Sequence, residues 1–142
     1  MTNGKRILCL EDDATTRVIY VSGLKLVAET VAVVDGSAGL AKLQEDPCGY
    51  GLIFTDNNMP PGMDGLEFLA QALDYTIPKV MISMPISTDR LELHCRIREL
   101  GGIGLIMKPT RLSFLRNVAQ ELLQDGISPT YEAYARENRF VL

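Results

Sequence analysis

The chain has 142 residues and a formal net charge of −4, and this length suits one compact domain. A hydrophobic fraction of 46% can fill a core, and 23% charged residues can cover it. The acidity argues against direct nucleic-acid binding, because basic patches supply most of that affinity. With no apolar run of membrane-spanning length and no signal-peptide core after Met1, a cytoplasmic protein without membrane contact is expected.

Short apolar runs and helical patterns alternate along the chain. Strands are expected at 7–10, 29–34, 51–55, 79–82 and 103–107. Helices are expected at 14–26 with Asp13 as N-cap, after Ser37 to 43, after Asp64 to 73, around 93–100 and at 112–123. Five alternations predict an α/β fold, a doubly wound five-stranded parallel sheet with helices on both faces.

The chain divides at about residue 125. Residues 1–125 hold the five strands and their helices, whereas 126–142 form a C-terminal extension that is either a short helix or a linker. Tyr131, Tyr134 and Ala135 have helical spacing. Three scattered cysteines without metal-ligand spacing indicate reduced thiols, with Cys9 buried in the first strand. His94 has no partner at a suitable spacing and is expected on a solvated helix face.

Polar side chains follow four of the expected strands. They are Glu11 and Asp12 after the first strand, Asp56 after the third, Ser83 after the fourth and Lys108 after the fifth. Because the carboxyl ends of parallel strands share one edge, these side chains should converge there. Each has a plainer interpretation, such as a helix cap, a loop hydroxyl or a surface charge. Their coincidence at four strand ends favours a functional site.

Three close carboxylates repel one another unless a cation intervenes. Mg²⁺ prefers oxygen ligands, needs only one or two protein carboxylates and keeps sites for phosphate oxygens. Lys108 adds a second positive charge, and the Ser83 hydroxyl can donate to a phosphoryl oxygen. The pattern therefore predicts a magnesium-dependent site that holds a phosphoryl group.

The chain resembles the receiver domain of two-component response regulators, including the chemotaxis regulators, over about residues 5–125. The resemblance rests on four motifs in order. They are Leu10-Glu11-Asp12-Asp13, the segment 55–60 (TDNNMP) with Met63-Asp64-Gly65, Ser83, and Met107-Lys108-Pro109. The resemblance implies a flavodoxin-like fold with strand order 2-1-3-4-5 and a cis bond between Lys108 and Pro109.

The resemblance also implies roles for the site residues. Asp56 would be the phosphoacceptor, Lys108 would pair with its carboxylate or phosphate, and Ser83 would be the switch hydroxyl. Magnesium would be ligated by Asp12, Asp56 and the backbone carbonyl of Asn58, with Glu11 acting mainly through a metal-bound water. The implied partners are a sensor histidine kinase or phosphotransfer protein and an output protein or downstream domain, with a homodimer as a further possibility. The implied contact surface is the face of the fourth helix, fifth strand and last main helix.

Three residues depart from the family pattern. Leu105 stands where an aromatic residue is usual, and the large Met84, followed by Pro85, stands where a small residue is usual. These departures keep open a pseudo-receiver, a module for interaction or dimerisation that takes no phosphate. An enzyme, such as a phosphatase with Asp56 as nucleophile, is disfavoured because Asn58 offers no acid or base.

Overall fold

The computed structural model describes residues 4–85 and 89–140, in which helices and strands alternate as expected. The strands are β1 (Arg6–Leu10), β2 (Thr30–Val33), β3 (Tyr50–Thr55), β4 (Lys79–Ser83) and β5 (Gly104–Met107). The helices are α1 (Ala14–Leu24), α2 (Gly36–Glu45), α3 (Gly65–Gln71), α4 (Arg90–Glu99), α5 (Leu112–Asp125) and α6 (Pro129–Glu137). Every strand boundary lies within one residue of its expected position.

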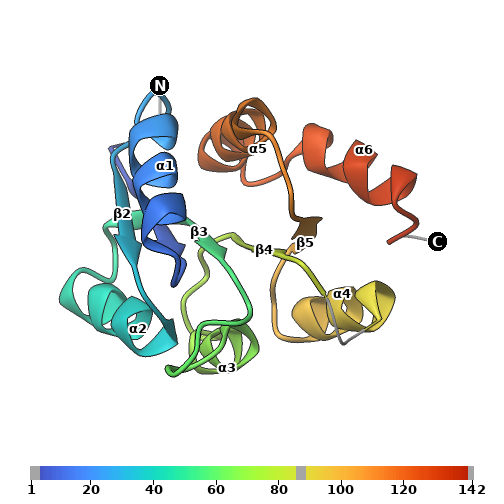
Figure 1. Cartoon of the computed structure of the whole chain (residues 1–142). Coiled ribbons are helices and arrows are strands. Elements are labelled where there is room, and N and C mark those ends of the chain that lie inside the picture. The colour runs from blue at the N-terminus through green and yellow to red at the C-terminus, as the bar shows by residue number, and fades with distance from the viewer. Residues whose placement is uncertain (1–3, 86–88, 141–142) are drawn as a thin grey trace.

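The five strands form one parallel sheet in the order β2-β1-β3-β4-β5. Figure 1 shows α1 and α5 on one face of this sheet and α2, α3 and α4 on the other. The predicted flavodoxin-like, doubly wound architecture is thus confirmed. Since all strands run the same way, their carboxyl ends lie at one edge.

Aspartate side chains cap the first turns of four helices, α1, α2, α3 and α4. Asp13 accepts a hydrogen bond from the Thr16 amide at 2.8 Å, and Asp64 accepts one from the Glu67 amide at 2.8 Å, both as predicted. The prediction that Ser37 caps α2 is wrong. Asp35 is the N-cap, because its carboxylate reaches the Ala38 amide at 2.9 Å.

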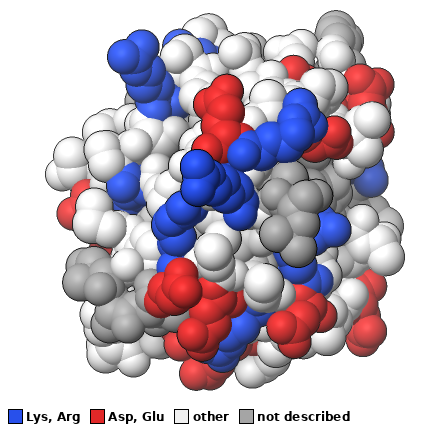
Figure 2. Space-filling view, turned by 90° about the vertical axis from the view of Figure 1, so that its right-hand side faces the viewer, with Lys and Arg blue, Asp and Glu red and all other residues white. Residues whose placement is uncertain are grey.

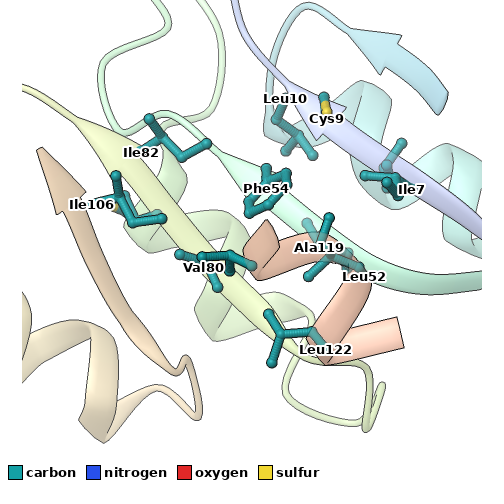
Figure 3. Packing of buried hydrophobic residues seen from close by; sticks show 14 of the residues in the cluster. Ile7, Cys9, Leu10, Leu52, Phe54, Val80, Ile82, Ile106, Ala119 and Leu122 are labelled. Atoms are coloured by element: carbon teal, nitrogen blue, oxygen red, sulfur yellow. The ribbon is translucent and has the colours of Figure 1, made fainter. Parts of the chain in front are cut away.

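The core lies between the central strands and the helices. Figure 3 shows Leu52 and Phe54 of β3 packed among side chains of β1 and β4, with Ala119 and Leu122 of α5 nearby. All four are at most 2% exposed, and burying a large apolar side chain contributes roughly 1.5–3 kcal/mol. Cys9 is fully buried as expected, and burial raises the pKa of its thiol.

Helix α6 lies beyond the edge strand β5, beside α5 (Figure 1). Ser128 caps it by accepting from the Tyr131 amide at 3.0 Å. The expectation that His94 is solvated is wrong: its side chain is buried, and its ring stacks on Phe140 at 4.6 Å. The segment after α6 covers a helix face that would otherwise meet solvent. None of the helices in the described residues is long and apolar enough to cross a membrane.

Candidate functional site

Three carboxylates meet at the carboxyl edge of the sheet. Glu11 and Asp12 follow β1, and Asp56 follows the neighbouring strand β3. One oxygen from each lies within 4.8 Å of one from both others. Glu11 and Asp56 are buried, whereas Asp12 is exposed. The edge therefore combines two buried acids with one acid that faces solvent.

Lys108 links the two buried acids. Its Nζ donates to Glu11 Oε1 at 2.7 Å and to Asp56 Oδ2 at 3.0 Å. The side chains of Glu11 and Asp56 are 1% and 11% exposed, and that of Lys108 is 27% exposed. An ammonium between two buried carboxylates offsets part of their repulsion. The cis peptide bond between Lys108 and Pro109 is present as the resemblance implies.

The pKa values of this cluster move for different reasons. Burial raises the pKa of Glu11, although the Lys108 ammonium and the Asp13 amide partly offset this by donating hydrogen bonds to it. Burial alone would lower the pKa of Lys108, but its hydrogen bonds to Glu11 and Asp56 outweigh that effect and raise it. Lys108 therefore stays charged at neutral pH, in a site that is otherwise acidic.

The predicted switch residue Ser83 is the last residue of β4 and is 2% exposed. Its backbone carbonyl accepts from the Lys108 amide at 3.0 Å, which ties the ends of β4 and β5 together. The neighbouring Met84 is half-exposed. Ser83 thus lies on the strand end next to Lys108.

The loop after β3 holds Asp56 in position. The Asn57 amide donates to Asp56 Oδ1 at 2.7 Å, and Asn57 Oδ1 accepts from the Leu66 amide at 3.2 Å. A Cβ on Gly65 would lie 2.2 Å from the Asp56 carbonyl oxygen, so glycine permits this close approach. Asn58 is exposed in the same loop, and ligation of magnesium by its carbonyl stays a prediction.

Arg17 is a residue that sequence reasoning missed. Its Nη1 donates to the carbonyl oxygens of Glu11 and Asp12 at 3.0 and 2.9 Å. These bonds hold the turn that carries both acids. The available signal was its spacing, because an arginine one helical turn after the Asp13 cap can reach back over the preceding loop.

The donor set fits a hard divalent cation. Three carboxylate oxygens lie close together at a partly exposed edge, and Mg²⁺ prefers oxygen ligands with room for waters and phosphate oxygens. Histidine and cysteine are absent from the cluster, which makes it a poor match for a zinc centre. Together with Lys108, the edge is suited to a phosphoryl group held between two positive charges.

Comparisons with known proteins agree with this geometry. The family described as response regulator receiver domain matches residues 7–120. The two-component response regulator ARR11 of Arabidopsis thaliana is 30% identical over 127 residues, covering 85% of this chain and 23% of that protein. ORR21 of Oryza sativa subsp. indica is 25% identical over 131 residues, covering 91% of this chain and 18% of that protein. The chain spans less than a quarter of the length of these relatives.

Solved structures match the fold. The chemotaxis protein CheY4 of Vibrio cholerae is 25% identical with a TM-score of 0.68, covering 78% of this chain and 92% of that one. A receiver domain protein from Clostridium thermocellum has a TM-score of 0.71 at 16% identity, covering 96% of this chain and 99% of that one. The second likeness shows a shared fold only.

Proposed function

The chain belongs to the response regulator receiver domain family of two-component signalling, and we propose that it is a phosphorylatable receiver with Asp56 as the phosphoacceptor. The observation that carries this proposal is the Lys108 ammonium bound to Asp56 beside two further acids. The donor would be the phosphohistidine of a sensor histidine kinase or of a phosphotransfer protein.

In the proposed reaction, an Asp56 carboxylate oxygen forms a bond to phosphorus while the phosphorus–nitrogen bond of the phosphohistidine breaks. The imidazole leaves with the bonding electron pair and takes up a proton. Lys108 lies 3.0 Å from Asp56 Oδ2, where it can neutralise charge on the transferred group. Water then attacks the phosphorus of the acyl phosphate, which releases inorganic phosphate and returns the carboxylate, so the protein would be a phosphoacceptor rather than an enzyme for another substrate.

We assign the metal to Asp12 and Asp56 directly, with the Asn58 carbonyl as a third ligand and Glu11 acting through water. Mg²⁺, when bound, neutralises phosphoryl oxygens during transfer. Ser83 would donate its hydroxyl to a phosphoryl oxygen from the next strand end. Ser83 is only 2% exposed, which supports a role that begins when the phosphate is present.

Residues 1–125 would form the receiver and residues 126–142 an extension. The signal would pass to an output protein or a downstream domain through a shift between two conformations. A homodimer is one form that this output can take.

A phosphate-affinity gel tests the proposal. Incubation with acetyl phosphate and Mg²⁺, or with a histidine kinase and ATP, should give a retarded band that is absent from Asp56→Asn. Asp35→Asn, in a helix cap, is the matched control and should still be phosphorylated. A wild-type chain that stays unmodified with both donors would favour the pseudo-receiver.

A further inference from the structure

The surface expected to transmit the signal is occupied by part of the chain itself. Helix α6 lies against α5 and the edge strand β5 (Figure 1). Edge strands carry unpaired backbone groups that attract other chains. Tyr131 Oη donates to the Leu105 carbonyl at 3.1 Å, and Tyr134 Oη accepts from the Met107 amide at 2.8 Å. Two tyrosine hydroxyls therefore satisfy backbone groups along β5.

The segment after α6 extends this cover to α4. Phe140 stacks on His94, with ring centroids 4.6 Å apart and an interplanar angle of 11°. Arg90 Nη1 donates to the Asn138 carbonyl at 2.6 Å, and its guanidinium lies 5.3 Å from the centre of the Phe140 ring. Residues 129–140 thus contact all three elements of the α4–β5–α5 surface.

Gly104 shows that β5 is shaped for this cover. A Cβ on Gly104 would lie 2.0 Å from Tyr131 Oη and 2.8 Å from His94 Nε2. Its φ is outside the positive region, so the backbone itself does not require glycine. A glycine inside a strand often marks a close approach by another group, and here that group is the Tyr131 hydroxyl.

The contact between α6 and α4 is incomplete. A cavity of about 390 Å³ lies where α4, α5 and α6 meet. Arg98 of α4 and Arg136 of α6 both line it, together with Glu132. Figure 2 looks onto this side of the molecule, where Lys and Arg side chains gather across the middle. Across this open pocket α6 and α4 make no direct contact, so fewer contacts must break when α6 separates from α4.

One end of the cover touches the candidate site through the backbone. The Met107 amide bound by Tyr134 immediately precedes Lys108, whose Nζ binds Asp56. A phosphoryl group on Asp56 would add charge and bulk beside Lys108 and would accept a hydrogen bond from the Ser83 hydroxyl. Both residues belong to strand ends that are joined by the bond from the Lys108 amide to the Ser83 carbonyl.

We propose that α6 is an internal lid on the α4–β5–α5 surface, and that phosphorylation of Asp56 releases it through the end of β5 and frees that surface for a partner. This inference rests on the proposed phosphoacceptor function. Helix α6 would be either docked on the surface or released from it, and the change next to Lys108 would shift the balance between these two states. Before phosphorylation, a partner that binds this surface must first displace α6.

Hydrogen–deuterium exchange of the full chain, read by mass spectrometry, tests the lid. In Mg²⁺ alone, the amides of residues 132–138 should be protected. In the fraction whose intact mass shows one added phosphoryl group, they should exchange at least tenfold faster. Gly104→Ala should give the same loss of protection without phosphate, because its methyl group meets the Tyr131 hydroxyl.

Tyr134→Phe keeps the ring and removes one hydrogen bond, so it should speed exchange of α6 by between about twofold and tenfold. Tyr75→Phe, between α3 and β4, is the matched control and should leave α6 unchanged. A phosphorylated chain whose α6 stays fully protected overturns the lid but leaves the proposed function intact. Wild-type protection in Gly104→Ala also overturns it. A chain that takes no phosphate from either donor removes both proposals.

Discussion

Lys108→Met is the most direct test of how the acidic edge is stabilised. The substitution keeps an unbranched stem and removes the ammonium that binds Glu11 and Asp56. At an effective dielectric constant near 20, two charges 2.7 Å apart attract by roughly 6 kcal/mol. Desolvation of the groups and the 27% exposure of Lys108 offset more than half of this. We expect a loss of about 2–3 kcal/mol in the free energy of unfolding.

The loss should depend on pH in a defined direction. Burial already raises the pKa of Glu11, and removing the ammonium raises it further. An acid whose pKa is higher in the folded state binds more protons folded than unfolded, so stability falls as pH rises. The deficit of Lys108→Met should therefore be smallest below the unfolded pKa of Glu11, near 4.5, and should grow toward neutral pH.

Urea unfolding followed by circular dichroism, with a chelator present, measures both quantities. The matched control is Lys42→Met, which removes an exposed ammonium 3.8 Å from Glu45 and should change stability by less than about 0.5 kcal/mol. Wild-type stability for Lys108→Met at pH 7.5, with no pH dependence, would refute the view that Lys108 offsets a buried excess of acid.

Three further outcomes are expected. Mg²⁺ at ten times its dissociation constant should add about 1.4 kcal/mol to wild-type stability, and most of this gain should vanish in Asp12→Asn. Glu121 accepts three hydrogen bonds from Ser128 and Thr130 at the start of α6. Glu121→Gln should lower the free energy of unfolding by about 1–2 kcal/mol and speed hydrogen exchange of the α6 amides. Exchange rates equal to those of the wild type would contradict this. Burial, and to a lesser extent the charge of Arg98, lowers the pKa of His94. Protection of the α6 amides against hydrogen exchange should therefore be full above pH 6.5, the ordinary pKa of histidine, and should fall as the pH drops below it. His94→Gln should reduce this dependence on pH. Glu132 and Arg136, which line the same cavity, remain in that variant.

The fold was predictable because its signals are local. The parallel strands are short apolar runs, and four of the five are followed by candidate site residues at the same sheet edge. Asp13 and Asp64 were identifiable as caps because a carboxylate stands three residues before the amide that it accepts from. Asp35 and Ser37 compete two residues apart at the start of α2, so spacing alone could not choose between them.

The proximity of the acids and Lys108 was predictable from topology, whereas the contacts that hold them were not. The bonds from Arg17 to two carbonyl oxygens depend on the path of the turn after β1, which residue types alone do not determine. His94 was misjudged for a related reason. Its burial comes from Phe140, 46 positions later, so no periodicity within α4 could reveal it.

Leu105 illustrates how the tail changes the interpretation of the sequence. Taken alone, the leucine at this position of β5 was one of the departures that kept open a pseudo-receiver. In the fold, the aromatic groups come from outside the strand, with Tyr131 bound to the Leu105 carbonyl and Tyr134 to the Met107 amide. Because these hydroxyls bind the backbone of β5, the proposed lid would respond to movement of the strand itself, and a shift of Lys108 would reach α6 through the neighbouring Met107 amide.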